Sequence, residues 1–216
     1  MHYEISNGVT IKSENAAKSY TQPSKYVLNI LEKLENVNFA LDYGCGKARY
    51  TLSLCNISNH VDAIDSLAQV TREQVIWGTK TKLTKWCEGI TKLSIYAIEE
   101  FHWEANKYDF ILNTNVLSSI PYERDRITVL HNIKKGLNDY GKALITSQYR
   151  NSYFSSYRDK TNTYKFNDGW IIQSRGNYSF YGLIDKNKLL QYANLVGLSV
   201  EKLLLHDGSV YLFVNK

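Results

Sequence analysis

The stretch that decides the fold reads Phe39-Ala40-Leu41-Asp42-Tyr43-Gly44-Cys45-Gly46-Lys47-Ala48-Arg49-Tyr50-Thr51-Leu52. A short apolar run stops at two glycines, and apolar residues at helical spacing begin again at Tyr50. This order predicts a strand, a glycine turn and a helix. Glycines let a ligand lie against bare backbone, and the first turn of a helix offers unpaired amide groups. The sequence therefore predicts a ligand site at this turn.

The same alternation of strands and helices continues along the chain. Further strands are expected at 61–65, 93–98, 108–112, 143–146, 198–205 and 210–214, and helices at 23–34, 67–76, 127–137 and 189–196. Alternating strands and helices predict a doubly wound α/β fold with a mostly parallel, seven-stranded sheet. Asp207-Gly208 separates the last two strands and predicts an antiparallel C-terminal hairpin.

Two acidic residues frame the glycine turn. Asp42 precedes the glycines, and Asp65 ends the second strand about 20 residues downstream. A carboxylate at Asp42 can accept hydrogen bonds from an ammonium group but would repel a pyrophosphate, and Arg49 stands where a dinucleotide fingerprint has its third glycine. An acid at the position of Asp65 can hold both hydroxyls of a ribose. A ligand with an amine at one end and a ribose at the other is S-adenosylmethionine.

Over residues 23–214 the chain resembles the class I S-adenosylmethionine-dependent methyltransferases. The first motif of that family matches 42–46, its ribose-binding acid matches Asp65, and its fourth-strand motif matches 108–117. Ala48 replaces a common third glycine and still permits the turn. The resemblance implies a Rossmann-like methyltransferase fold, methyltransferase activity and S-adenosylmethionine as cofactor. The cofactor-binding residues that it implies are Asp42, Tyr43, Gly44, Cys45, Gly46, Asp65, Ser66, Glu99, Asn113 and Asn115.

One segment differs from the rest of the chain in charge and aromatic content. Residues 142–188 contain eight Lys or Arg and three acids, which equals the net charge of +5 of the whole chain, and ten aromatic residues lie within 149–181. Because the family places variable insertions after the fifth strand, we expect 149–184 to form a cap over the acceptor. The expected acceptor-binding residues are Tyr149, Arg150, Trp170 and Tyr181. Residues 1–22 then form an N-terminal arm, and 23–216 form a single domain.

These features predict methyl transfer by direct in-line displacement, driven by alignment of the reactants in a dry pocket. The sequence marks no residue as a general base, so the catalytic residues are unknown, and it contains no cluster with the spacing of a metal site. A charge of +5 over this window is modest for a polyanion groove, which favours a small-molecule acceptor over a nucleic acid. Two alternatives stay open: an RNA or DNA methyltransferase that uses 142–188, and a non-catalytic subunit of a larger assembly.

Composition bounds the class of protein. The chain has 216 residues, of which 44% are hydrophobic, and its mean hydropathy is −0.36, as expected for one globular domain. Its apolar runs are much shorter than the ~18 residues that cross a bilayer, and no secretory signal pattern is present, so no membrane association is expected. Cys45, Cys55 and Cys87 form no CxxC pair and are odd in number, which favours a reducing, cytoplasmic location. The sequence does not indicate an oligomeric state.

Overall fold

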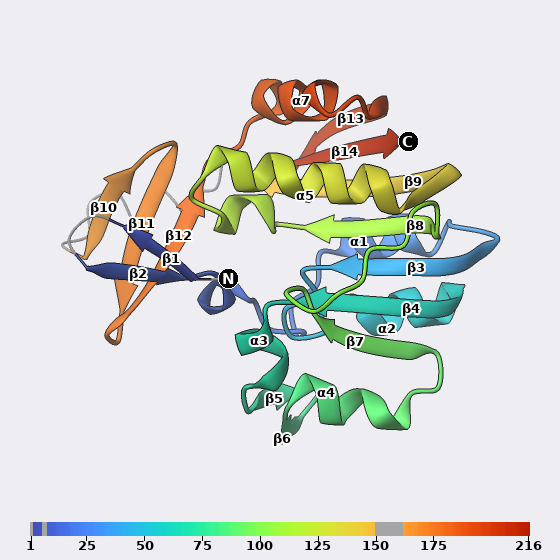
Figure 1. The fold of residues 1–216 in the computed structure, drawn as a ribbon, viewed down its shortest axis with the longest axis horizontal. Coiled ribbons are helices and arrows are strands. Elements are labelled where there is room, and N and C mark those ends of the chain that lie inside the picture. The colour runs from blue at the N-terminus through green and yellow to red at the C-terminus, as the bar shows by residue number, and fades with distance from the viewer. Residues whose placement is uncertain (1, 6–7, 150–161) are drawn as a thin grey trace.

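The computed structural model describes residues 2–5, 8–149 and 162–216, and its largest element is a seven-stranded sheet (Figure 1). The strands are β3 (Val37–Tyr43), β4 (Ser58–Asp65), β7 (Leu93–Ala97), β8 (Tyr108–Thr114), β9 (Leu137–Gln148), β13 (Ser199–His206) and β14 (Ser209–Asn215). Their order across the sheet is β13-β14-β9-β8-β3-β4-β7. The last five strands in this order are parallel, and β14 is antiparallel to β9 and to β13. The predicted sheet and its C-terminal hairpin are confirmed.

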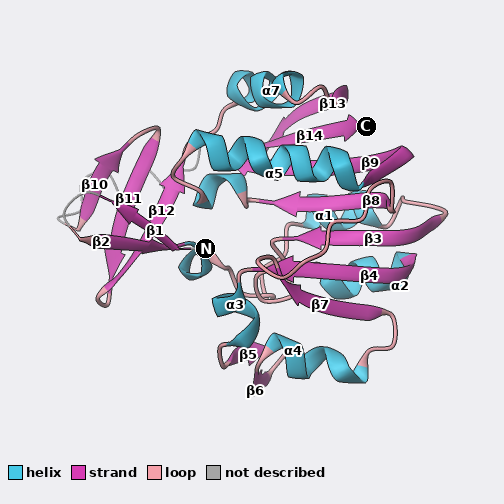
Figure 2. Cartoon of the chain, in the orientation of Figure 1, coloured by secondary structure: helices cyan, strands magenta, loops and turns pink. Residues whose placement is uncertain are grey.

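Helices cover both faces of this sheet, as Figure 2 shows. They are α1 (Lys25–Leu31), α2 (Thr51–Ile57), α3 (Leu67–Thr71), α4 (Leu83–Trp86), α5 (Glu123–Gly136) and α7 (Lys186–Leu195), with 3-10 turns η1 (Ser13–Ala16), η2 (Cys87–Gly89) and η3 (Leu117–Ser119). Alternate strand residues point to opposite faces. Leu41 of β3 therefore packs with α5 and α7, whereas its neighbour Ala40 packs with α1 and α2.

One predicted helix is shorter than expected. The apolar pattern at 67–76 predicts a single helix, but α3 ends at Thr71, and β5 (Gln74–Ile76) pairs with β6 (Thr79–Thr81) in a separate hairpin. Trp77 and Gly78 at its turn both have positive φ, 46° and 85°. Two successive left-handed residues are the geometry of a tight hairpin turn, and that local geometry overrides the helical spacing.

A second sheet lies beside the first (Figure 1). Its strands are β1 (His2–Ile5), β2 (Val9–Lys12), β10 (Thr163–Phe166), β11 (Gly169–Ser174) and β12 (Asn177–Gly182), in the order β1-β2-β12-β11-β10. The insertion after the fifth large-sheet strand, β9, is thus present, and the segment expected to be an arm adds two strands to it. Ile11 of β2 lies opposite Tyr178 of β12 and is fully buried.

A buried ion pair connects this second sheet to the helices of the first. Arg126 of α5 is fully buried, and its Nη2 donates to Oδ1 of Asp168 at 2.8 Å, while its Nε donates to the carbonyl of Ile120. Lys188 of α7 donates to Oδ2 of Asp168 at 2.7 Å. Burial alone would raise the pKa of Asp168, but the hydrogen bonds from Arg126 and Lys188 outweigh it and lower that pKa. Asp168 is therefore an ionised structural group.

Candidate functional site

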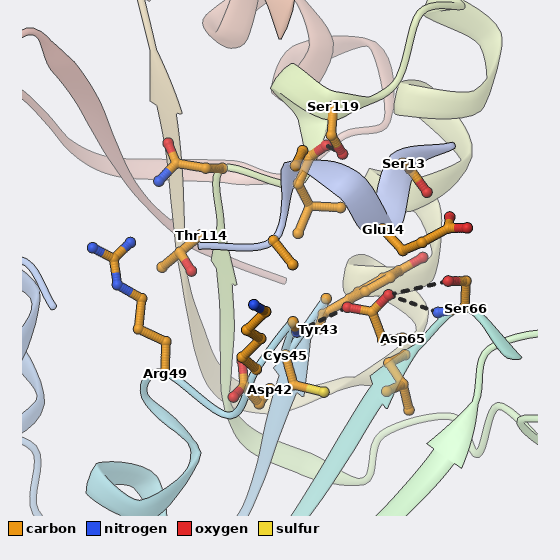
Figure 3. Close-up of a pocket in the computed structure, with 18 of the residues that line it drawn as sticks. Ser13, Glu14, Asp42, Tyr43, Cys45, Arg49, Asp65, Ser66, Thr114 and Ser119 are labelled. Atoms are coloured by element: carbon orange, nitrogen blue, oxygen red, sulfur yellow. Dashed lines mark hydrogen bonds between the residues drawn. The ribbon is translucent and has the colours of Figure 1, made fainter. Parts of the chain in front are cut away.

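A pocket lies at the carboxyl ends of β3, β4 and β8 (Figure 3). It holds about 890 Å³ of empty space, including its open mouth. Its walls come from five places: the glycine turn after β3, the end of β4, Ile98 after β7, the loop after β8, and the segment 13–18 that crosses above them. In open α/β sheets, ligands bind at this edge, where the order of the strands reverses.

The glycine turn leaves no room for side chains at the base of the pocket. The amides of Gly44 and Cys45 both donate to the carbonyl of Ile64, at 2.8 and 3.1 Å. Gly44 has a φ of +81°, and a Cβ built on it would lie 2.2 Å from Cγ2 of Val116. Ala48 also adopts a left-handed φ, +57°, at the position where a third glycine is common. Gly44 therefore allows the close approach of Val116 to the turn.

Asp65 organises the turn as well as lining the pocket. Its Oδ2 accepts from the amide of Gly46 at 2.8 Å, and its Oδ1 accepts from the amide of Ser66 at 2.7 Å. Burial raises the pKa of Asp65, and these two amide hydrogen bonds only partly offset that rise. Ser66 caps α3 by accepting from the amide of Gln69. Oδ1 also accepts from the hydroxyl of Ser66 at 3.4 Å, whereas Oδ2 keeps a second lone pair for a hydroxyl group of a ligand.

Asp42 lies deeper in the pocket wall and is only 2% exposed. Its Oδ2 accepts from the hydroxyl of Thr51, the first residue of α2, at 2.6 Å. Burial raises the pKa of Asp42 to about 7, the hydrogen bond from Thr51 lowers it, and the charge of Asp65 adds to the rise. A cationic group bound beside Asp42 would favour its ionised form.

The structure brings most of the expected cofactor residues together. The pocket is lined by Asp42, Tyr43, Gly44, Cys45, Gly46, Asp65, Ser66 and Asn115. Among the residues that the structure describes, the buried Oδ1 of Asn115 has no hydrogen-bond partner. Asn113 does not line the pocket, because it is fully buried and donates to the carbonyl of Tyr43. Glu99 lies outside the lining too, since its Oε2 accepts from the amide of Leu67 at 2.8 Å.

The expected acceptor residues do not line this pocket. Trp170 and Tyr181 face each other in the register of β11 and β12, and the hydroxyl of Tyr181 donates to Oε1 of Gln148. The amide of Tyr149 donates to the carbonyl of Gly208. The side chain of Tyr149 packs against the hydrophobic cluster that contains Leu41 and Leu130. Arg150 lies outside the described residues.

Sequence reasoning missed one wall of the pocket, the segment 13–18, which we call the strap. The strap contributes Ser13, Glu14, Ala16, Ala17 and Lys18 to the lining. Its sequence shows no apolar period, and its place depends on contacts with residues far along the chain. No local signal could have indicated it.

Side chains distant in sequence fix the strap in place. Glu14 is 6% exposed, with Oε1 2.7 Å from Nε2 of His2, and its carbonyl accepts from Arg72 at 2.9 Å. Just after the strap, Tyr20 stacks on Trp77, and the indole of Trp77 donates to the carbonyl of Ala48 in the glycine turn. The strap, the β5–β6 hairpin and the glycine turn are thus connected.

Two further findings concern metal binding and membrane-spanning helices. Among the residues that the structure describes, no group of three or more His, Cys, Asp or Glu gathers as a metal site requires. Within the same ranges, the helices are too short or too polar to cross a membrane.

Comparisons with known proteins agree with this fold. The family model described as tellurite resistance protein TehB matches residues 12–169. The uncharacterized protein YmfD of Escherichia coli K12 is 36% identical over 210 residues, covering 97% of this chain and 94% of that protein.

Solved structures are similar in fold at low sequence identity. A methyltransferase from Clostridium acetobutylicum, described as S-adenosylmethionine-dependent, has a TM-score of 0.64 at 14% identity and covers 93% of each chain. The 1,6-didemethyltoxoflavin-N1-methyltransferase of Burkholderia thailandensis, solved with its substrate and S-adenosylhomocysteine, has a TM-score of 0.61 at 14% identity, covering 93% of this chain and 80% of that one. The chain therefore belongs to the tellurite resistance protein TehB family and has the class I S-adenosylmethionine-dependent methyltransferase fold that its sequence predicts.

Proposed function

We propose that this S-adenosylmethionine-dependent methyltransferase transfers a methyl group to a small-molecule acceptor by direct in-line displacement. The observation that carries the proposal is the pocket at the ends of β3, β4 and β8, which the strap crosses. Small-molecule sites are typically concave pockets, so the shape of this site supports a small acceptor. The similar methyltransferase from Burkholderia thailandensis was solved with a small-molecule substrate.

The residues that line the pocket fit the proposed cofactor. Asp65 can accept from ribose hydroxyls, and Asp42 can accept from an ammonium group. Gly44 and Gly46 carry no side chains, and Asn115 offers a buried oxygen that has no hydrogen-bond partner within the described ranges. When bound, S-adenosylmethionine supplies an electrophilic methyl group on a positively charged sulfur.

The protein's own contribution to the reaction is alignment and exclusion of water. The strap covers one side of the pocket, and Val116 packs against Gly44 on another. Holding two reactants in line replaces a bimolecular encounter by an effectively unimolecular step. Asp168 does not act as a base, because its carboxylate is committed to Arg126 and Lys188.

We propose that the cap, 149–184, covers the acceptor, and that Tyr149, Trp170 and Tyr181 contribute to its binding. In support, β12 packs against both η1 and η3, and residues of both turns line the pocket. The second sheet therefore lies directly behind two walls of the pocket. Arg150 remains a proposed acceptor ligand of the same segment.

Transfer of a labelled methyl group tests the proposed function. The protein is incubated with methyl-labelled S-adenosylmethionine and separate cell-extract fractions: small molecules, RNA, DNA and protein. We expect label in the small-molecule fraction. Label in RNA or DNA, with binding that weakens steeply as salt rises, would support the nucleic-acid alternative instead. Tight binding of S-adenosylhomocysteine without transfer to any fraction would support a non-catalytic subunit.

A further inference from the structure

The β5–β6 hairpin, all of which is described, contributes no residue to the pocket lining, yet it contacts the glycine turn. Trp77, at the turn of the hairpin, donates from its indole N–H to the carbonyl of Ala48 at 3.1 Å. The same indole stacks on Tyr20, which follows the strap, with ring centres 4.9 Å apart. Trp77 is 44% exposed, so filling the core does not account for its position.

A second set of contacts connects the base of the hairpin to the same turn. Gln69 of α3 is fully buried, and its side-chain nitrogen donates both to the carbonyl of Gly46 and to Oε1 of Gln74, the first residue of β5. Gln74 donates back to the carbonyl of Gln69 at 2.8 Å. The hairpin therefore contacts Ala48 through its tip and reaches Gly46 through Gln69 at its base.

The glycine turn has a backbone geometry that such contacts stabilise. Ala48 has a φ of +57°, in the left-handed region that is unfavourable for a residue with a Cβ. Ala48 is also fully buried, and a buried carbonyl requires a hydrogen-bond partner. The indole of Trp77 supplies one. Without it, we expect the turn to sample other conformations, which would displace Cys45 and Gly46 in the pocket lining.

The strap depends on the same short segment of chain. Arg72, between α3 and β5, donates to the carbonyl of Glu14 at 2.9 Å, and Trp77 holds Tyr20 by stacking. Between these two contacts the strap lies directly over the turn, since a Cβ built on Gly46 would be 3.5 Å from Cβ of Ala17. Residues 69–77 thus contact both the strap and the glycine turn, two opposite walls of the pocket.

We infer that the β5–β6 hairpin is a positioning element of the cofactor site and that Trp77 is a positioning residue. Trp77 does not touch the cofactor. It acts through Ala48 on the glycine turn and through Tyr20 on the chain that leaves the strap. The inference rests on the proposed function, because it takes the turn and the strap as walls of the S-adenosylmethionine site.

Calorimetry with S-adenosylhomocysteine and hydrogen exchange of the ligand-free protein together test this role. Trp77→Phe keeps an aromatic ring against Tyr20 but removes the N–H donor, whereas Tyr20→Ala removes the stacking and keeps the donor. Val75→Ala is the matched control, because Val75 is 52% exposed on the same hairpin. Trp77→Phe is also made in an Ala48→Gly background, since glycine adopts a left-handed φ without strain.

We expect Trp77→Phe to weaken S-adenosylhomocysteine about three- to tenfold, as the loss of one hydrogen bond would, and Tyr20→Ala about two- to fivefold. The amides of the turn are hydrogen-bonded within the fold, so their exchange should become faster in Trp77→Phe. Val75→Ala should match the wild type in both measurements. In the Ala48→Gly background, adding Trp77→Phe should weaken binding by no more than about twofold.

Four outcomes would overturn the inference. The first is that Trp77→Phe changes neither measurement, or only one of them. The second is an equal effect of Val75→Ala, which would mean that any change in the hairpin disturbs the fold. The third is an equal loss from Trp77→Phe in both backgrounds, which would mean that the effect does not pass through Ala48. The fourth is wild-type affinity in Tyr20→Ala.

Failure of the proposed function gives a different result. In that case the wild type itself does not bind S-adenosylhomocysteine, and the cofactor role of Trp77 falls with it. Exchange of the turn amides needs no ligand, so it still shows whether Trp77 holds the glycine turn.

Discussion

Asp65 shows how a single side chain serves both the turn and the ligand. Its carboxylate accepts from the amides of Gly46 and Ser66, so it joins the glycine turn to the start of α3. We expect Asp65→Ala to weaken S-adenosylhomocysteine at least tenfold, because hydrogen bonds to a charged group contribute about 1.5–3 kcal/mol each. Calorimetry measures this loss. Asp65→Asn should lose less, because it keeps one acceptor oxygen, and equal affinity in wild type and Asp65→Ala would contradict the assignment.

Gly44 allows a direct test of the close approach in the turn. Adding a methyl group at Gly44 places it against Val116, in a backbone conformation that strains every residue with a Cβ. Gly44→Ala should therefore distort the turn and abolish measurable cofactor binding, read by calorimetry. Gly176→Ala is the matched control, since Gly176 also has a positive φ, +76°, but nothing near its Cβ direction. Full cofactor affinity in Gly44→Ala would show that the turn does not contact the ligand.

The raised pKa of Asp42 predicts that the stability of the protein depends on pH. Its pKa is raised to about 7 in the folded protein, mainly by burial, whereas an exposed aspartate titrates near pH ~4. The folded state therefore holds this proton more tightly than the unfolded state does. Its contribution to the free energy of unfolding is fully present below pH ~4 and is lost as the pH rises toward about 7.

Urea unfolding at several pH values measures this contribution. Asp42→Asn removes the titration, so the unfolding free energy of the variant minus that of the wild type should increase between pH ~4 and ~7. Cofactor-free protein is required, because a bound ammonium group would favour the ionised form of Asp42. A pH-independent difference between the two proteins would contradict the predicted titration.

At the scale of elements, the cap is fixed by Arg126, Asp168 and Lys188. Arg126 is 1% exposed in its side chain and Asp168 is 23% exposed. Removing one partner of a buried pair leaves an uncompensated charge, so Asp168→Asn should lower the free energy of unfolding by about 3 kcal/mol or more. Glu201→Gln breaks the exposed pair with Lys142 and should cost less than about 1 kcal/mol. Urea unfolding compares the two variants, and similar small losses would count against a structural role for the pair.

The sequence predicts the elements whose signals are local and misses those that depend on distant contacts. The β3 strand, its glycine turn and α2 follow from a few neighbouring residues, and so do Asp42 and Asp65 at the pocket. The strap has no such local pattern. Glu99 and Asn113 were expected to bind the cofactor, but each makes a hydrogen bond within the fold that no sequence pattern specifies.

At the scale of the whole molecule, the hairpin formed by β1 and β2 is part of the core. Ile11 is fully buried in the cluster that contains Ile171 and Phe180 of the cap. Ile11→Ala should lower the free energy of unfolding by about 2–5 kcal/mol, the usual cost of emptying a buried aliphatic site. Val9→Ala on the same strand, which is half-buried, should cost clearly less. Urea unfolding checks both, and a negligible loss in both variants would mean that the hairpin is a dispensable arm.

The pairing of β2 with β12 also sets an order of events during synthesis. These strands are separated by most of the chain, so at ~5–20 residues per second the ribosome releases the second roughly ten to thirty seconds after the first. Until then the β1–β2 hairpin lacks its partner strand, whereas Arg72, which donates to the carbonyl of Glu14 in the strap, has already been synthesised. The second sheet is therefore completed late, after all five parallel strands of the large sheet have been synthesised.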